Sequence, residues 1–289
     1  MKKVCVIVGP TASGKTKLSI ELAKAYDMEI INGDSVQVYK RLDIGSAKIK
    51  EDEKEGISHV LIDYIDPIHQ YSVYDFQQDV RLAIEKIDHP LIVGGTGLYI
   101  KAALYDYEFE EMGRDDSFEQ IYQNVSTEMI YQELMKLDKD IKIDSKNRRR
   151  VLRALEQAKL GYLRSEKDKK DKLLYDALII YLDLDRITLE ERLIKRLDHM
   201  IEEGFIEEVA SLLEDGINKN VIGYRELAQY LKGELTLIEA KALIIKKSKQ
   251  LAKKQKTWFK NQMHPHILDA NSQTLVRDCK SLIDDFLKE

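Results

Sequence analysis

The sequence of 289 residues has few of the residues that mark disordered, fibrous or disulfide-bonded chains, with only four prolines and two cysteines. Hydrophobic residues make up 44% and charged residues 34% of the chain, a balance that predicts a folded, helix-rich α/β protein. Cys5 and Cys279 stand at opposite ends of the sequence, without the close spacing of a metal site. We therefore expect a reduced, cytoplasmic protein.

A long hydrophobic segment and an excess of positive charge are also missing. The first apolar segment, Val4 to Val8, is far too short for a signal sequence or a membrane span, and Gly9 and Pro10 end it. The formal net charge of −5 argues against binding of polyanions over the whole surface. We expect no membrane association, and any contact with nucleic acid requires a local basic patch.

Short apolar segments predict strands that alternate with helices, the order typical of a parallel sheet. The expected strands are residues 4–8, 28–32, 89–95 and 178–185. Three pairs of residues predict the starts of helices: Ser72 with Asp75, Thr188 with Glu191, and Thr236 with Glu239.

Between Glu110 and Lys172 the strand signal disappears and the density of charged residues rises. This change predicts an inserted all-helical domain. The expected organisation is therefore a core in two parts, residues 1–109 and 173–289, with the helical insertion at residues 110–172 and a basic helix near the C-terminus.

The stretch GPTASGKT matches the phosphate-binding pattern GxxxxGK[ST], found in nucleotide- and ATP-binding proteins, and it stands between an expected strand and an expected helix. Backbone N–H groups would hold phosphate oxygens, Lys15 would supply a positive charge, and the Thr16 hydroxyl could join the shell of Mg²⁺. The alternative is a glycine turn without a ligand. The candidate phosphate-binding residues are Gly9, Pro10, Thr11, Ala12, Ser13, Gly14, Lys15 and Thr16.

Two further candidates follow expected strands at the same edge of the sheet. Asp34 follows residues 28–32, where its carboxylate could accept a proton or bind a donor group of a substrate. Thr96 carries the only hydroxyl in the stretch GGTG. Either feature could instead be a plain turn, with Asp34 capping local N–H groups.

Together, GPTASGKT, DSVQVYKRLDIGSAK, LIVGGTGLYIKAAL, RRRVLRALE, GYRE and AKKQKTWFK resemble the bacterial tRNA dimethylallyltransferases over nearly the whole chain. The resemblance implies a P-loop NTPase-like parallel sheet flanked by helices, with the helical insertion contacting tRNA. It implies transfer of a dimethylallyl group from dimethylallyl diphosphate to N6 of the adenosine 3′-adjacent to the anticodon. The P-loop would then bind the leaving diphosphate, with Mg²⁺, in a monomeric enzyme.

The resemblance also implies roles for individual residues. Asp34 would take the proton of N6 and Thr96 would lie at the reacting centre. Ser35, Val36 and Gln37 would line the adenine pocket. Arg225, in GYRE, would be a second diphosphate ligand, and its alternative is a salt bridge to Glu226.

An RNA substrate requires a basic surface, and residues 246–260 supply seven lysines at helical spacing with no acidic residue. The alternative is an ordinary solvated helix face. A second basic cluster lies in RRRVLRALE. The candidate tRNA-binding residues of the two clusters are Lys249, Lys253, Lys256, Arg149 and Arg153.

Three rival functions remain at this stage. A P-loop kinase acting on a small metabolite or nucleotide would use Asp34 as its base. The sequence lacks the lid-like arginine pairs of such kinases, which argues against this function. A non-catalytic RNA-binding module would leave Asp34 and Thr96 unexplained. An adenylate isopentenyltransferase would alkylate free nucleotides, and the insertion and the lysines favour a polynucleotide instead.

Overall fold

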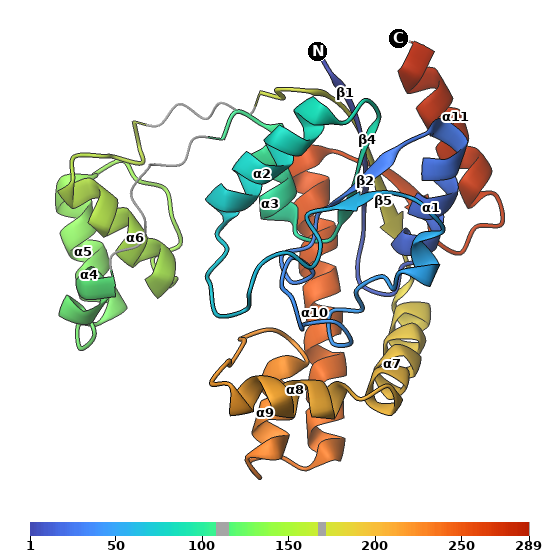
Figure 1. Ribbon diagram of the computed structural model, residues 1–289. Helices are drawn as coiled ribbons and strands as arrows, with labels where there is room; N and C mark the ends of the chain where they lie inside the picture. Colours follow the sequence, from blue (N-terminus) through green and yellow to red (C-terminus); the bar gives the residue numbers. More distant parts are fainter. Residues whose placement is uncertain (108–115, 167–171, 289) are drawn as a thin grey trace. The chain divides into compact units, whose positions relative to one another are not determined.

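A computed structural model describes residues 1–107, 116–166 and 172–288 (Figure 1). The chain forms two compact units, Met1–Tyr107 with Lys172–Glu289, and Glu108–Asp171. Residue 110, where we expect the insertion to begin, lies outside the described residues.

The first unit is built on a six-stranded parallel sheet in the order β3-β2-β4-β1-β5-β6. The four strands expected from the sequence are confirmed, whereas β3 and β6 were not expected because they are short edge strands without a fully buried residue. The strands are β1 (Lys3–Val8), β2 (Glu29–Asn32), β3 (His59–Val60), β4 (Pro90–Gly94), β5 (Asp176–Asp183) and β6 (His266–Asp269).

Helices cover both faces of the sheet and extend beyond its carboxyl edge (Figure 1). Ser72 and Thr236 cap α2 and α10 with their side chains, as the sequence predicts. The helices of this unit are α1 (Lys15–Tyr26), η1 (Asp52–Lys54), α2 (Val73–Lys86), α3 (Gly97–Leu104), α7 (Arg186–Glu202), α8 (Phe205–Glu214), α9 (Tyr224–Leu231), α10 (Leu237–Met263) and α11 (Leu275–Lys288).

The helix expected after β5 is present as α7, but the prediction that Thr188 and Glu191 open it is wrong. Helix α7 begins at Arg186, because the Asp185 carboxylate accepts the backbone N–H groups of Ile187 and Thr188, each at 2.9 Å. Thr188 therefore lies inside the first turn. Because the Asp185 side chain accepts the free N–H groups of the first turn, Asp185 is the N-cap and the helix starts directly after it.

The buried strand β1 shows how the core is divided. Val4, Val6 and Val8 face the layer that contains α2, α3 and the second half of α10. Cys5 and Ile7 face the opposite layer, which contains α1 and α11. This alternation is the two-residue period of a strand that is buried on both faces. Both cysteines of the chain are free and buried.

Helices α7, α8, α9 and the first half of α10 form a third hydrophobic cluster beyond the carboxyl ends of the strands (Figure 1). Phe205 and Leu227 are at most 1% exposed at its centre. Leu42, from the loop after β2, is buried in the same cluster. The loops that follow the strands are therefore enclosed between the sheet and a helical layer.

The second unit has helices and no strand among its described residues. Its helices pack around the fully buried Ile130, Leu134, Val151 and Leu155. They are α4 (Asp116–Ile121), α5 (Thr127–Leu137) and α6 (Arg148–Lys159).

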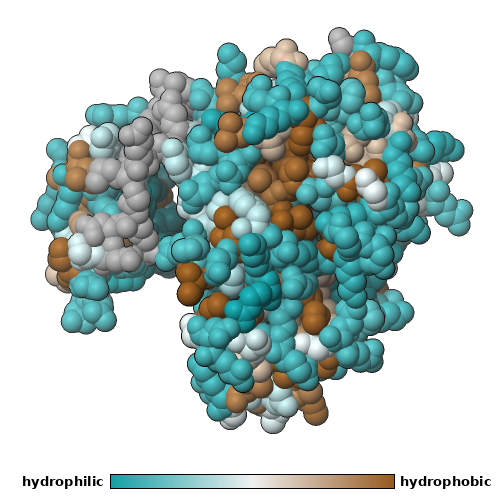
Figure 2. Space-filling view, viewed as in Figure 1, coloured by the Kyte–Doolittle hydropathy of each residue, from teal (hydrophilic) through white to brown (hydrophobic). Residues whose placement is uncertain are grey.

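The visible face of the molecule is mostly hydrophilic, with hydrophobic side chains in small groups (Figure 2). Among the described residues, no helix combines the length and the apolarity that are needed to span a membrane.

Candidate active site

The phosphate-binding motif forms the loop between β1 and α1, at the carboxyl edge of the sheet. A Cβ atom at Gly9 would lie 2.8 Å from the carbonyl oxygen of Leu182 in β5, so the close approach of the two strands requires glycine. Gly14 caps α1 with a φ of 84°, in the left-handed region. The free N–H groups at the start of α1 therefore lie next to the loop. Other P-loop proteins bind phosphate with this arrangement.

Three side chains of the loop are suited to an anion. The Ser13 hydroxyl is buried and has no hydrogen-bond partner in the described structure. The Lys15 ammonium donates to the carbonyl oxygens of Gly9, at 3.0 Å, and Pro10, at 2.7 Å. Thr16 is exposed at the first turn of α1.

The electrostatics of Lys15 connect the loop with two other charged residues. Burial lowers the pKa of Lys15 to about 8, the negative charge of Asp34 opposes that shift, and the positive charge of Arg196 adds to it. Burial also lowers the pKa of Arg196, and Asp34 opposes that shift too. Two cations and one carboxylate therefore share one partly buried space, and an added anion would relieve the repulsion between the cations.

Asp34 and Thr96 lie in loops that are bonded to each other. The backbone N–H of Ser35 donates to Thr96 Oγ1 at 3.1 Å, and the Thr96 hydroxyl lies 3.3 Å from Ser35 Oγ. Asp34 Oδ1 accepts the N–H of Val36 at 2.8 Å, so this carboxylate does cap a local turn. No hydrogen bond from the described residues reaches its other oxygen, Oδ2, which leaves that oxygen able to accept a proton.

The three residues expected at the adenine pocket differ in what they contact. Val36 lines a cavity together with Asp34, and Ser35 is bonded to Thr96. The Gln37 amide donates to the carbonyl oxygens of Ser46 and Ala47, at 3.1 and 3.2 Å, so it stabilises its own loop.

The same loop is fixed to α8 by a carboxylate. Glu208 accepts the backbone N–H groups of Asp43, Ile44 and Gly45 at 2.7 to 3.1 Å, and the Tyr224 hydroxyl at 2.6 Å. Bonds to a charged acceptor are among the stronger hydrogen bonds in proteins. Glu208 therefore stabilises the loop between Val36 and Ala47 from the side opposite to the sheet.

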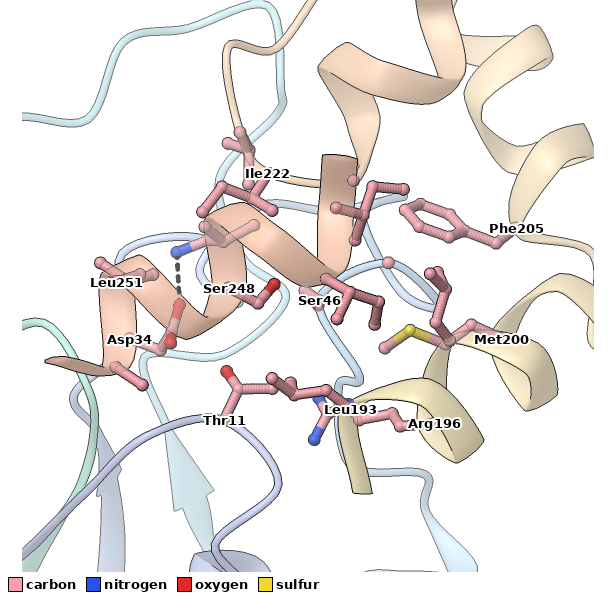
Figure 3. Close-up of a pocket in the computed structure, with 18 of the residues that line it drawn as sticks. Thr11, Asp34, Ser46, Leu193, Arg196, Met200, Phe205, Ile222, Ser248 and Leu251 are labelled. Atoms are coloured by element: carbon pink, nitrogen blue, oxygen red, sulfur yellow. Dashed lines mark hydrogen bonds between the residues drawn. The ribbon is translucent and has the colours of Figure 1, made fainter. Parts of the chain in front are cut away.

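A cavity of about 170 Å³ lies between the P-loop and the helical layer (Figure 3). Its charged lining residues are Asp34 and Arg196, and its uncharged polar ones are Thr11, Ser46, Ser248 and Gln255. Its other walls are mostly apolar side chains of α7, α8 and α10 and of the loop before α9: Leu193, Leu197, Met200, Phe205, Ile222, Ile244 and Leu251. The cavity thus combines two charged groups beside the P-loop with walls that are mostly apolar.

The sequence analysis missed Arg196, which lines the cavity from α7 and has a buried Nε without a hydrogen-bond partner among the described residues. One turn earlier, Arg192 donates to the carbonyl oxygen of Ala12 in the P-loop, at 3.3 Å, and to Asn271 Oδ1, at 2.7 Å. The signal in the sequence is a pair of arginines four residues apart beside the leucines at 189, 193 and 197. Helix α7 therefore presents two guanidinium groups to the P-loop region.

Arg225 lies outside the residues that line the cavity. Its guanidinium donates to Glu226 Oε1, at 2.7 and 2.9 Å, and to Asn220 Oδ1, at 2.8 Å. Glu226 is fully buried and also accepts from Lys247 and from the N–H of Gly223, each at 2.7 Å. Arg225 thus takes part in the ion-pair network at the start of α9.

The candidate tRNA-binding lysines of α10 differ in whether a carboxylate already pairs with them. Lys249 pairs with Glu190 of α7, and Lys256 pairs with Asp183 at the end of β5, at 2.5 Å. Lys253 is exposed and makes no ion pair with the described residues. In the second unit, Arg149 is exposed, and Arg153 pairs with Glu156 at 2.6 Å.

Comparison with known proteins identifies the family. A model of IPP transferases matches residues 37–262. The chain belongs to the IPP transferase family. It is 51% identical to the tRNA dimethylallyltransferase of Acholeplasma laidlawii, over 99% of both chains.

Solved structures of relatives have the same fold as this chain. A tRNA isopentenylpyrophosphate transferase of Staphylococcus epidermidis is 38% identical, with a TM-score of 0.74 over 99% of both chains. A eukaryotic dimethylallyltransferase acting on tRNA is 30% identical, with a TM-score of 0.86 over all of this chain and 80% of that one. The fold expected from the P-loop, a parallel sheet flanked by helices, is thus the fold of the family.

Proposed function

We propose that this enzyme transfers a dimethylallyl group from dimethylallyl diphosphate to N6 of the adenosine 3′-adjacent to the anticodon in tRNA, and releases diphosphate. The observation that carries the proposal is one cavity in which Thr11 of the P-loop, Asp34 and Arg196 meet walls that are mostly apolar. Such a cavity suits a donor that joins a charged diphosphate to an apolar tail. The relatives named above are prenyltransferases of tRNA.

The diphosphate would bind to the P-loop amides, Ser13, Lys15 and Arg196. An exocyclic amine is a poor nucleophile, so most of the catalysis has to come from stabilising the leaving group. As the N6 lone pair attacks C1 of the dimethylallyl group, the C1–O bond breaks and its electrons leave with the diphosphate. Of the two arginines, Arg196 has better support as a diphosphate ligand than Arg225, because Arg196 lines the cavity.

Asp34 would act as the base. One of its oxygens is fixed by the Val36 N–H, and this fixed turn would point the other oxygen at the N6 proton. Thr96 would lie near the oxygen that bridges C1 and the diphosphate, as an additional hydrogen-bond donor. Ser35 and Val36 would contact the adenine.

Mg²⁺ would accompany the diphosphate and neutralise part of its charge. The residues present fit this ion, since Mg²⁺ is commonly held by one or two protein oxygens together with phosphate oxygens. Thr16 offers such an oxygen, and among the described residues there is no group of three or more His, Cys, Asp or Glu side chains that could form a separate metal site.

The exposed lysines of α10 and Arg149 of α6 would bind phosphates of the anticodon stem-loop, with the enzyme acting as a monomer. Binding of tRNA should then weaken steeply as the salt concentration rises. An affinity for tRNA that does not change with salt concentration would show that these residues do not bind its phosphates.

The test is to incubate the protein with unmodified tRNA, Mg²⁺ and dimethylallyl diphosphate, and to measure N6-alkylated adenosine by mass spectrometry. Asp34→Asn and Thr96→Ala should each lower the rate about 100-fold or more, while diphosphate binding survives. Parental rates in both variants would contradict the assigned roles. Phosphate transfer from ATP without alkylated product would favour a kinase.

A further inference from the structure

Helix α10 contacts the loop that carries Thr96. The side-chain amide of Gln255 donates to the carbonyl oxygen of Gly95 at 2.8 Å, across 160 residues of sequence. A Cβ atom at Gly95 would lie 2.9 Å from Gln255 Nε2, so the absence of a side chain at Gly95 allows this approach.

The Gly95 carbonyl belongs to the peptide group whose nitrogen is that of Thr96. That N–H donates to the carbonyl oxygen of Gly33 at 3.3 Å, and the Thr96 hydroxyl is bonded to Ser35. A hydrogen-bonded connection therefore runs from Gln255 through one peptide plane to the loop of Asp34. Because a peptide group is planar and stiff, fixing its carbonyl also fixes the direction of its N–H.

A second contact, one turn further along α10, supports the first. The ring of Trp258 lies over Gly97, where an added Cβ atom would be 2.3 Å from a ring carbon. Trp258 packs edge to face on the fully buried Phe259, which contacts Tyr181 of β5. Trp258 is thus supported by the core, and α10 contacts the chain on both sides of Thr96, at Gly95 in the loop and at Gly97 at the start of α3.

We propose that Gln255 is a positioning residue, which sets the Thr96 hydroxyl and the Asp34 carboxylate at the separation that the transfer requires. The inference rests on the proposed function and deepens it. A misplacement of about 1 Å can cost an enzyme up to roughly 100-fold in rate without weakening substrate binding. Loss of the Gln255 bond should therefore lower kcat and leave KM unchanged.

The experiment compares three substitutions in the tRNA alkylation assay. Gln255→Met has a similar size and no donor, Gln255→Glu places a carboxylate against the carbonyl, and Gln255→Lys keeps an N–H donor. We expect kcat to fall about 10-fold or more for the Met and Glu variants, with both KM values within about twofold of the parent, and the Lys variant to recover most of the activity. Gln250→Met, at an exposed position of the same helix, is the matched control and should behave as the parent.

Thermal unfolding of the variants separates positioning from general stability. Unchanged melting temperatures with a lower kcat support the proposal. It would be overturned by parental kcat in Gln255→Met, by equal losses in the Met and Lys variants, by a rise in KM alone, or by a loss that follows the melting temperature. If the parent itself makes no alkylated adenosine, the proposed function fails instead.

Discussion

Lys15 gives the sharpest test of the proposed diphosphate contact, because the pKa of its side chain in the free protein is lowered to about 8, mainly by burial. At pH 7 about nine in ten molecules would carry the charged ammonium, and at pH 9 roughly one in ten, so the apparent affinity for diphosphate should fall about tenfold from this group alone. The fall arises because binding above pH 8 first requires Lys15 to take up a proton.

Isothermal titration with inorganic diphosphate and Mg²⁺ at pH 7 and pH 9 measures this fall. Lys15→Arg is the matched control, since arginine stays protonated throughout and the titration of the diphosphate itself is common to both proteins. We expect the affinity ratio between pH 7 and pH 9 to be about tenfold larger in the parent. Equal ratios in the two proteins would refute the contact between Lys15 and the anion.

The free energy of unfolding gives an independent measurement on the same residue. An unfolded lysine has a pKa near 10.5, so the unfolded chain binds more protons than the folded protein between pH 8 and pH 10.5. The parent should therefore gain stability relative to Lys15→Met as the pH rises through this window. The full shift corresponds to about 3 kcal/mol, and partial exposure of Lys15 reduces the expected gain to roughly 1–2 kcal/mol. A constant difference would show that the ammonium is not destabilised by folding.

Two substitutions test the helical layer that encloses the site. Glu226→Gln removes a fully buried carboxylate that pairs with the partly exposed Arg225 and Lys247. Because solvent reaches the two cations that remain, urea denaturation should show a loss of about 1–3 kcal/mol, whereas the exposed Glu234→Gln should show little change. Gly45→Ala would put a Cβ atom 2.1 Å from the Phe205 ring, so we expect a loss of about 1–3 kcal/mol and a slower enzyme. The Cβ atom would also lie 2.6 Å from the Tyr224 ring, so adding Phe205→Leu should restore only part of the activity. Parental stability and rate in Gly45→Ala itself would contradict the steric explanation.

The parts of the fold that were predicted correctly depend on residues close together in the sequence. The phosphate loop and the capping residues Ser72 and Thr236 each act within one turn of chain, so a local pattern contains the whole interaction. The start of α7 was misplaced although it too is local, because Asp185 and Thr188 are both good capping residues three positions apart. The extended backbone of Asp185 after the end of β5 decided between them.

Arg196 could not be assigned from the sequence for a different reason. Its role depends on where α7 crosses the P-loop, and the contact of Arg192 with Ala12 that fixes this crossing spans 180 residues. By spacing alone, the two arginines are indistinguishable from the solvated face of any amphipathic helix. The buried Nε of Arg196 has no hydrogen-bond partner among the described residues, and this distinguishes Arg196 from a solvated surface charge.

The roles of the lysines of α10 also depend on contacts that the sequence does not reveal. These contacts reduce the number of lysines that are available to bind tRNA. Residues 246–260 contain seven lysines and no acidic residue, but Lys247, Lys249 and Lys256 are paired with carboxylates on α9, α7 and β5. The others are exposed, without ion pairs to the described residues: Lys246, Lys253, Lys254 and Lys260. A phosphate would have to compete with an existing carboxylate at the first group and only with water at the second. Contacts with RNA should therefore depend more on Lys253 than on Lys249, although helical spacing makes the two positions look equivalent.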